Sequence, residues 1–350
     1  MFSYQRMRVR QCGQADQRGS RGLREALVDK LEHRNRIRCE LDDIVVTNGG
    51  THGLFLTFQA LLDSGDDVLA LSPHWMAVPK LVAFVPGARL RTVPAYLELL
   101  EGTLDAAGLA ARLRVAVGPT TRGIYLNSPN NPTGAVLDAE ALAAIAEVAI
   151  ERDLWVVSDE AYEDLVFDDA RHLSIAALAG MAERTVSVYT FSKSYAMTGW
   201  RLGYVVAPPA MRAVLGPLLA FYTTHGVFPA VQSAGRAAVL GGAAAIETMR
   251  RAYQERRDVL LGGLAGQSAV RVPAPRGAFY AFADVSAVRA GRDIWALVEE
   301  WLALGLAVLP GTAFGPEYGD WVRMSLATRR EDVAAAAALL SRRYATAPAR

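Results

Sequence analysis

Short apolar segments alternate with longer helical segments through the middle of the chain, and this alternation constrains the fold most strongly. LWVVS at 154–158 and TVSVYT at 185–190 contain few polar residues. Apolar segments as continuous as these are typical of strands that are covered on both faces. Strands separated by helical segments indicate βαβ units and therefore a mainly parallel sheet flanked by helices.

The predicted elements define an α/β fold with two domains. Strands are predicted at Asp43–Thr47, Val68–Leu71, Arg89–Val93, Gly123–Asn127, Leu154–Ser158, Thr185–Thr190 and Gly203–Val206. Helices are predicted at about 53–63, 75–85, 105–116, 137–152 and 209–222, and one long helix at roughly 232–264. We predict a large cofactor-binding domain at residues 1–250, with a seven-stranded, mainly parallel sheet, and a smaller C-terminal α+β domain at residues 251–350.

Composition excludes several classes of partner. The 350 residues include 37 basic and 36 acidic residues, so no excess positive charge indicates binding to nucleic acid or to an anionic membrane. No stretch approaches the roughly 20 apolar residues that span a bilayer, and the first residues contain no apolar signal segment. Cys12, Cys39 and the five scattered histidines show no metal-ligand spacing. We expect a cytoplasmic protein without a metal.

Lysine is rare in this chain. Arginine accounts for 34 of the 37 basic residues, and the lysines are Lys30, Lys80 and Lys193. A lysine that persists against this preference indicates amine chemistry that a guanidinium cannot perform. Lys30 and Lys80 lie in helical segments and are expected on the surface, whereas Lys193 lies between a predicted strand and a glycine-containing turn.

The segment TFSKSYAMTGWRLGY at 190–204 carries the strongest chemical signal. Lys193 can form an imine with an aldehyde cofactor, and Arg201 can bind a phosphate with two parallel hydrogen bonds. Thr190 and Ser192 add hydroxyl groups, and Gly199 allows the turn that returns Arg201 to the same place. The alternative is a surface lysine and a structural arginine around an ordinary loop.

Polar residues follow two other predicted strands. Asp159, in VVSDEAYEDL, can pair with a protonated pyridine nitrogen and so make that ring an electron sink. Tyr162 can reach a phenolic oxygen of the same cofactor, and Asn131, in LNSPNNPTGAV, can donate to it or to a substrate carboxylate. A helix-capping aspartate, a packing tyrosine and a generic turn are the alternatives. Ligand crevices of open α/β sheets lie at the carboxyl ends of the strands, where these residues are expected to meet.

Three weaker signals accompany these segments. Paired glycines in VVTNGGTHGLF stand at a strand-to-helix junction, where backbone N–H groups suit a phosphate. Trp75 follows a strand and can stack on a flat ring, although core packing is the better interpretation of this residue alone. Arg323 lies within the apolar strand WVRMSLA and needs an anionic partner, either an internal carboxylate or that of a substrate.

Taken together, the ordered motifs NGGTHGL, SPHW, NSPNNPTG, SDEAY, SKSYAMTGWRLGY, PRGAFY, PGTAFG and VRMSLA resemble those of the class I/II aminotransferases of fold type I, in the aspartate aminotransferase-like subgroup. The resemblance extends from about Gly19 to Arg330. It implies an enzyme that uses pyridoxal 5'-phosphate, works as a homodimer, and moves an amino group between an α-amino acid and a 2-oxo acid.

The resemblance also implies residue roles. Lys193 would be the Schiff-base lysine and proton carrier, Asp159 would pair with the pyridinium nitrogen, and Tyr162 would contact the ring hydroxyl, which makes these three the catalytic group. Arg323 and Asn131 would bind the substrate. The cofactor would be held by Gly50, Thr51, Trp75, Asn131, Asp159, Tyr162, Thr190, Ser192, Lys193 and Arg201.

The chain departs from the family pattern at its start. Members usually begin several tens of residues earlier, with a dimer-bridging arm, part of the small domain and a substrate loop. Gln14 stands where a tyrosine that reaches the neighbouring subunit's phosphate is usual. We therefore expect this sequence to lack the arm, and to leave apolar surface of the small domain uncovered.

Three functions fit the residues. The first is an aminotransferase. The second is a related lyase or synthase acting on a modified amino acid, because both reactions need the same carbanion chemistry. The third is a shortened, inactive relative that binds cofactor. Because Thr51 is neutral and only His74 and His225 are candidates for a second cation, we expect a neutral or aromatic amino acid to be preferred over aspartate.

Overall fold

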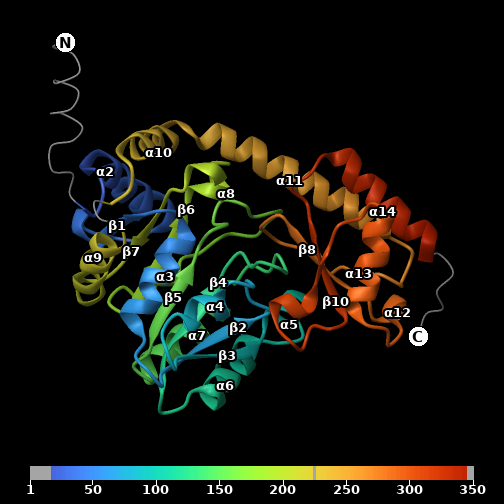
Figure 1. Ribbon diagram of the computed structural model, residues 1–350, viewed down its shortest axis with the longest axis horizontal. Coiled ribbons are helices and arrows are strands. Elements are labelled where there is room, and N and C mark those ends of the chain that lie inside the picture. The colour runs from blue at the N-terminus through green and yellow to red at the C-terminus, as the bar shows by residue number, and fades with distance from the viewer. Residues whose placement is uncertain (1–16, 224–225, 345–350) are drawn as a thin grey trace, which may run out of the picture.

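A seven-stranded sheet forms the centre of the larger part of the computed structural model, which describes residues 17–223 and 226–344 (Figure 1). The strand order is β1-β7-β6-β5-β4-β2-β3, and only β7 runs antiparallel to its neighbours. The bounds are β1 Ile44–Thr47, β2 Asp67–Ser72, β3 Arg89–Pro94, β4 Thr121–Asn127, β5 Trp155–Asp159, β6 Thr185–Thr190 and β7 Gly203–Val206. The predicted mainly parallel sheet is confirmed, with every predicted strand present to within two residues at each end.

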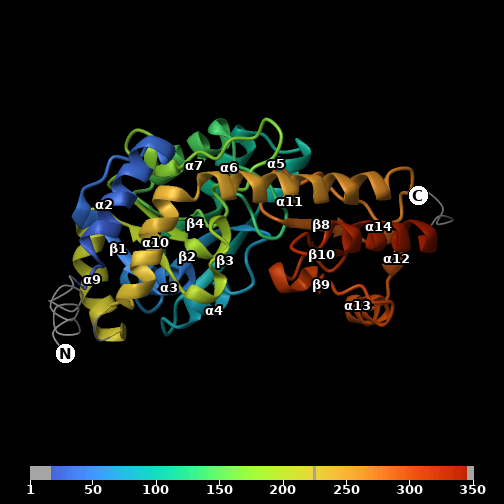
Figure 2. The same cartoon turned by 90° about the horizontal axis from the view of Figure 1, so that it is seen from above.

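Helices cover both faces of this sheet (Figure 2). Along β2, Val68 and Ala70 pack into the core formed with α3 and α4, whereas Leu69 and Leu71 pack into the opposite core with α6 and α7. Because alternate residues of a strand point to opposite faces, a strand buried on both faces needs apolar residues throughout. The helices are α2 Arg21–Lys30, α3 Gly50–Leu61, α4 Val78–Ala83, α5 Tyr96–Glu101, α6 Ala106–Ala116, α7 Ala139–Glu151, α8 Phe191–Ser194 and α9 Pro209–Thr223.

The prediction of one continuous helix at 232–264 is wrong at one point, Gly242. The structure has two helices, α10 Pro229–Gly241 and α11 Ala243–Leu264, which meet at Gly242. Two consecutive glycines weaken a helix because each lacks a side chain and loses much backbone entropy on folding. A Cβ at Gly242 would also lie 2.4 Å from the Ala238 carbonyl oxygen, so this residue is closely packed at the break.

The C-terminal part contains a second, smaller sheet with the order β8-β10-β9, all antiparallel (Figure 1). Its strands are β8 Tyr280–Asp284, β9 Leu309–Pro310 and β10 Trp321–Ser325, and its helices are α12 Ser286–Arg289, α13 Ile294–Ala303 and α14 Arg330–Tyr344. The fully buried Trp301 lies in the core that these elements share with α11. The predicted small α+β region is thus present. Because α11 passes unbroken through residue 250, the exact domain boundary stays a prediction.

Helix α11 joins the two sheets. It starts beside the large sheet and then runs along α14, a helix of the small domain (Figures 1 and 2). Within the described residues, no helix is both long enough and apolar enough to cross a membrane.

The carboxyl ends of the central parallel strands meet at one edge of the large sheet. Register pairs Asn127 at the end of β4 with Asp159 at the end of β5, and Thr190 at the end of β6 with Gly203 on β7. The polar residues that follow these strands are therefore brought together where open α/β sheets bind ligands.

Candidate active site

A cavity of about 310 Å³ lies at this edge, between the large sheet and the small domain. Every residue that the sequence predicted for the site lines it. These residues are Gly50, Thr51, Trp75, Asn131, Asp159, Tyr162, Thr190, Ser192, Lys193, Arg201 and Arg323. They come from six separate segments of the chain, and the sheet topology brings those segments together.

Lys193 lies within the short helix α8, which follows β6 directly. The Thr190 side chain caps this helix by accepting a hydrogen bond of 3.1 Å from the Ser192 backbone N–H. The Lys193 Nζ atom lies 5.8 Å from the ring centre of Tyr162 and 5.4 Å from that of Phe279. Burial lowers the pKa of Lys193, against an opposing effect of the Asp159 charge. A lowered pKa raises the share of neutral amine, which is the form that attacks a carbonyl.

Donors for an anion also gather at this cavity. Helix α3 begins at Gly50, so its free backbone N–H groups and positive dipole end lie at the cavity wall. The Arg201 Nη1 atom lies 3.4 Å from the Ser192 hydroxyl oxygen and donates to the Thr198 carbonyl at 2.8 Å. Gly49 has a φ of 86°, and a Cβ there would lie 2.5 Å from Arg201 Nη2. Only glycine at position 49 lets the guanidinium lie beside the helix end.

Asp159 is buried at the end of β5. Its carboxylate accepts hydrogen bonds from the Tyr125 hydroxyl at 2.9 Å and from the Ala161 backbone N–H at 3.2 Å. Burial raises its pKa to about 6, although both hydrogen bonds oppose the shift. A turn follows Asp159, so it does not cap a helix, which was the alternative interpretation. A cation placed against this carboxylate would favour its charged form.

Arg323, on β10, reaches the cavity from the small domain. Its Nη1 atom donates to the Asn131 side-chain oxygen at 3.1 Å, and its guanidinium lies 4.3 Å from the Tyr280 ring centre. The Nε atom is buried without a hydrogen-bond partner, and no carboxylate of the described residues forms an ion pair with Arg323. Of the two anionic partners that the sequence left open, the internal carboxylate is therefore excluded within the described residues.

Comparison with known proteins shows which family this chain belongs to. The model of the family "Aminotransferase class I and II" matches residues 13–340.

The chain belongs to the class I and II aminotransferase family.

Relatives of this aminotransferase match most of its length. A probable aspartate/prephenate aminotransferase of Thermus aquaticus is 40% identical over 315 residues, which cover 89% of this chain and 78% of that protein. An aspartate aminotransferase of Musicola paradisiaca is 37% identical over 325 residues, covering 91% and 78%. The solved structure of an aromatic aminotransferase from Pyrococcus horikoshii has a TM-score of 0.86 at 34% identity, covering 94% of this chain and 87% of that one. The protein is a pyridoxal-phosphate-dependent aminotransferase of fold type I.

Two tyrosines of the aminotransferase site were missed from the sequence. Tyr125 donates to Asp159, and the Tyr280 hydroxyl lies 3.3 Å from that of Tyr162 while its ring stacks against Arg323. A signal for Tyr125 was available, because it lies two residues before Asn127 on β4 and therefore on the same face of the strand. Tyr280 belongs to the PRGAFY motif, but that motif gave it no role.

The prediction that Lys30 lies on the surface is wrong. Lys30 is 4% exposed, and its Nζ atom donates to Glu163 at 2.6 Å and to the Tyr204 hydroxyl at 3.1 Å. The helical segment looked polar enough for solvent, yet its lysine is buried because a carboxylate from the distant turn after β5 neutralises it. Lys80, on α4, is exposed as predicted.

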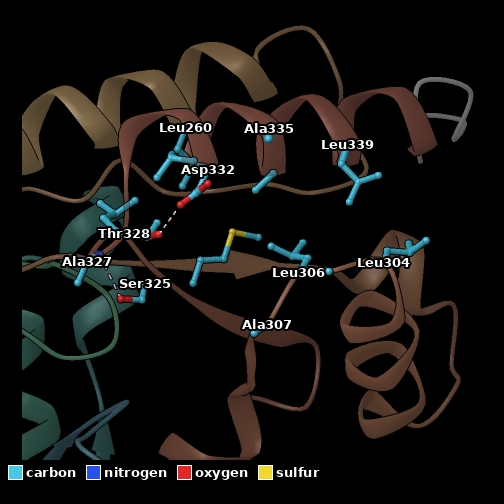
Figure 3. A pocket seen from close by; sticks show the side chains of 15 residues that line it. Leu260, Leu304, Leu306, Ala307, Ser325, Ala327, Thr328, Asp332, Ala335 and Leu339 are labelled. Atoms are coloured by element: carbon cyan, nitrogen blue, oxygen red, sulfur yellow. Dashed lines mark hydrogen bonds between the residues drawn. The ribbon is translucent and has the colours of Figure 1, made fainter.

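A larger cavity of about 500 Å³ lies in the small domain, between α11, α14 and β10 (Figure 3). Leu260, Leu306 and Leu339 are among its apolar lining side chains, and Asp332 is the only charged residue among the described ones that line it. Asp332 already accepts hydrogen bonds from Thr328 and Arg329. This cavity therefore offers no free group for catalysis. Gln14, where the family pattern suggested a partner-reaching tyrosine, lies outside the described residues.

Proposed function

We propose that Lys193, Asp159 and Tyr162 form the catalytic group of the transamination and that Arg323 binds the substrate carboxylate. The observation that carries this proposal is that the Arg323 guanidinium, which pairs with no carboxylate of the described residues and has a buried Nε atom without a partner, lies in the cavity that also holds the Lys193 amine. An α-amino acid has a carboxylate that the Arg323 guanidinium can bind, and the Lys193 amine of the same cavity can form an imine with an aldehyde cofactor.

The donor set fits pyridoxal 5'-phosphate. Thr190, Ser192, Arg201 and the backbone at Gly50 and Thr51 would hold its phosphate, because they combine hydroxyls, a guanidinium and a helix N-terminus. Asp159 would face the ring nitrogen, while Asn131 and Tyr162 would donate to the ring hydroxyl and Trp75 would cover the ring. When bound, the cofactor supplies an electron sink for the bond broken at the substrate Cα.

The chain's own residues supply orientation and proton transfer. Arg323 would fix the substrate carboxylate, with Asn131 beside it, so that the Cα–H bond faces Lys193. The Lys193 Nζ atom would then take the proton from Cα, a task that its lowered pKa favours at neutral pH. The rings of Phe279 and Tyr280, whose centres lie 4.6 Å apart, would place apolar surface beside the Lys193 amine on the side of the small domain.

We propose a neutral or aromatic amino acid as the preferred donor. Among the described residues that line the cavity, the cations are Lys193, Arg201 and Arg323, and each already has a role. Thr51 is neutral, His225 lies outside the described residues, and His74, whose Nδ1 atom faces the Trp75 carbonyl, does not line the cavity. A second carboxylate would therefore enter without a partner, whereas Leu54, Trp75 and Met76 offer apolar contacts.

Aspartate is the second candidate, because several relatives are named for it. To decide, the holoenzyme is mixed with one donor at a time and the loss of its cofactor absorbance band is followed. This half-reaction needs no oxo-acid acceptor, so the choice of acceptor cannot bias the result. We expect the second-order rate constant for phenylalanine or methionine to exceed that for aspartate by roughly tenfold. This is about the cost of burying the second carboxylate of aspartate without a partner. A larger constant for aspartate would contradict the proposal.

We also propose a cytoplasmic homodimer. Phe221 on α9 and Phe228 before α10 are 81% and 68% exposed, and the Tyr222 ring contacts that of Phe221. Large apolar side chains left exposed support an interface between subunits. Sedimentation equilibrium should give twice the mass of the chain, and Phe221→Ser with Phe228→Ser should shift it toward the monomer. A wild-type protein that is monomeric at micromolar concentration would overturn the dimer.

A further inference from the structure

The turn that follows β5 presents two sets of side chains in opposite directions. Asp159 and Tyr162 line the aminotransferase cavity, whereas Glu160 and Glu163 are directed away from it and lie in the protein interior. A spacing of three residues places side chains on the same face of a helical turn. Anything that fixes Glu160 and Glu163 therefore fixes the direction of Asp159 and Tyr162.

Glu160 is anchored at both carboxylate oxygens. It accepts hydrogen bonds from the hydroxyls of Ser158 at 3.0 Å, Ser174 at 2.6 Å and Tyr189 at 2.9 Å, and its second oxygen lies 2.9 Å from His172 Nε2. Burial opposes ionisation of Glu160, but His172, Ser174 and Tyr189 outweigh it and lower the pKa of this carboxyl. The start of the turn is thus held by a buried, charged side chain.

Glu163 is anchored from a segment 130 residues away. One oxygen accepts from Lys30 Nζ at 2.6 Å and the other from the Asn35 side-chain amide at 2.7 Å. Lys30 ends α2, and residues Leu31–Asn35 continue it as a π-helical turn. Donors five residues apart would diverge by about 140° on an α-helix, and the wider π turn brings them to one carboxylate. Such turns are rare and occur often at functional sites.

We propose that Lys30 is a positioning residue for transamination: its ammonium group anchors Glu163 and thereby keeps Asp159 and Tyr162 directed at the cofactor. Lys30 also contacts the Tyr204 hydroxyl and lies 4.6 Å from the Tyr189 ring centre, so it is fixed on several sides. The inference rests on the cofactor roles proposed above for Asp159 and Tyr162.

A metal ion is a poorer explanation of this cluster. Glu160, Glu163 and His172 each bring one ligand atom within 4.8 Å of the others. The Lys30 ammonium already supplies the positive charge that such a group of carboxylates requires, and it would repel a second cation.

The test compares Lys30→Met, the double variant Lys30→Met/Glu163→Leu, Asp159→Asn and the matched control Lys80→Met, all as holoenzymes. Replacing both members of a buried ion pair by apolar residues often preserves folding, so the double variant guards against failure of the single one. Readouts on the holoenzymes are kcat, KM and the visible circular dichroism of the bound cofactor. A second sample of each protein, stripped of cofactor, is used to measure amide exchange of residues 158–165. Assays are run at a temperature at which far-ultraviolet circular dichroism shows that each variant is folded.

We expect both Lys30 variants to lose roughly tenfold to a hundredfold in kcat with little change in KM, as small displacements of reacting groups do. The cofactor dichroism should weaken, and exchange in 158–165 should accelerate, while Lys80→Met matches the wild type. Normal dichroism and kcat in the double variant would overturn the positioning role. If Asp159→Asn also leaves dichroism and kcat unchanged, the proposed cofactor role itself fails; if only Asp159→Asn impairs them, the failure is confined to Lys30.

Discussion

The aminotransferase cavity and the buried network around Lys30 lie on opposite sides of the same turn, and each contains a lysine, at least one carboxylate, and tyrosines. In the network, both oxygens of Glu160 and both of Glu163 accept hydrogen bonds, and Lys30 forms a direct ion pair. In the cavity, Arg323 keeps an unpaired Nε atom, and Lys193 forms no ion pair within the part of the chain that the structure describes.

The two regions differ in whether their charged groups are paired within the protein or remain available to a ligand. Buried polar groups in folded proteins are almost always paired, because leaving one unpaired costs free energy. A charge that is paired within the protein serves the fold, as the Lys30–Glu163 pair does in the network. Groups that converge on a cavity and lack partners retain their capacity for a bound molecule. The two lysines therefore have different tasks although both lie largely inside the protein.

Removing the amine of the cavity is the strongest way to test this contrast. Lys193→Ala should abolish trapping of the yellow cofactor by borohydride and lower turnover by at least about 10⁴-fold, because one group serves as both attachment point and base. The measurements are mass spectrometry after reduction and a transamination assay. Lys80→Ala, at an exposed position, is the control and should behave like the wild type. Equal turnover in Lys193→Ala would refute the assignment.

Removing the unpaired cation should have the next largest effect. Arg323→Gln should lower kcat/KM for the amino acid by roughly 10- to 100-fold, since hydrogen bonds to charged groups contribute about 1.5–3 kcal/mol. Cofactor affinity should change little, because phosphate binding is assigned to Arg201. Arg329→Gln is a suitable control, because Arg329 pairs with Asp332 on the surface just beyond β10. If both variants lost the same activity, Arg323 would have no special role toward the substrate.

The smallest expected effect concerns the stability of the apoprotein. Because burial raises the Asp159 pKa from 3.8 to about 6, the folded apoprotein binds a proton more tightly than the unfolded chain. That contribution is fully present below about pH 4 and is lost as the pH rises through 6. The free energy of unfolding of the wild type minus that of Asp159→Asn should therefore fall by up to about 3 kcal/mol between pH 4 and 7.

Urea unfolding across this pH range measures the difference. Asp169→Asn is the control, because the Asp169 side chain is 92% exposed. It should leave the pH dependence of stability unchanged. A wild-type-minus-variant difference that stays constant with pH would mean that the Asp159 carboxyl titrates as an ordinary surface group does.

The sheet and the cavity residues were predictable because each rests on local sequence. Strands β6 and β7 were predicted to the residue, since apolar segments bounded by polar or glycine residues mark their own ends. The convergence of Asn131, Asp159 and Lys193 followed from one rule, that parallel strands end at one edge. Their assigned roles came from the family resemblance and stay predictions.

What could not be predicted depends on contacts between distant segments. The burial of Lys30 requires Glu163, which lies 133 residues further along the chain, and nothing near Lys30 indicates it. Similarly, the hydrogen bond from Tyr125 to Asp159 depends on the register between β4 and β5. The break at Gly242 was visible as a glycine pair but was outweighed by the helical pattern on both sides.

The reversed direction of β7 has a consequence for how tightly this enzyme can hold its cofactor. Antiparallel pairing of Thr190 with Gly203 closes the loop between them at both ends, so Lys193 and Arg201 lie on one pinned segment. The entropy of closing that loop is lost when the sheet forms, long before any ligand arrives. Lys193 and Arg201, which are proposed to bind the aldehyde and the phosphate of the cofactor, are then already in place. Cofactor binding therefore need not order this segment of the chain.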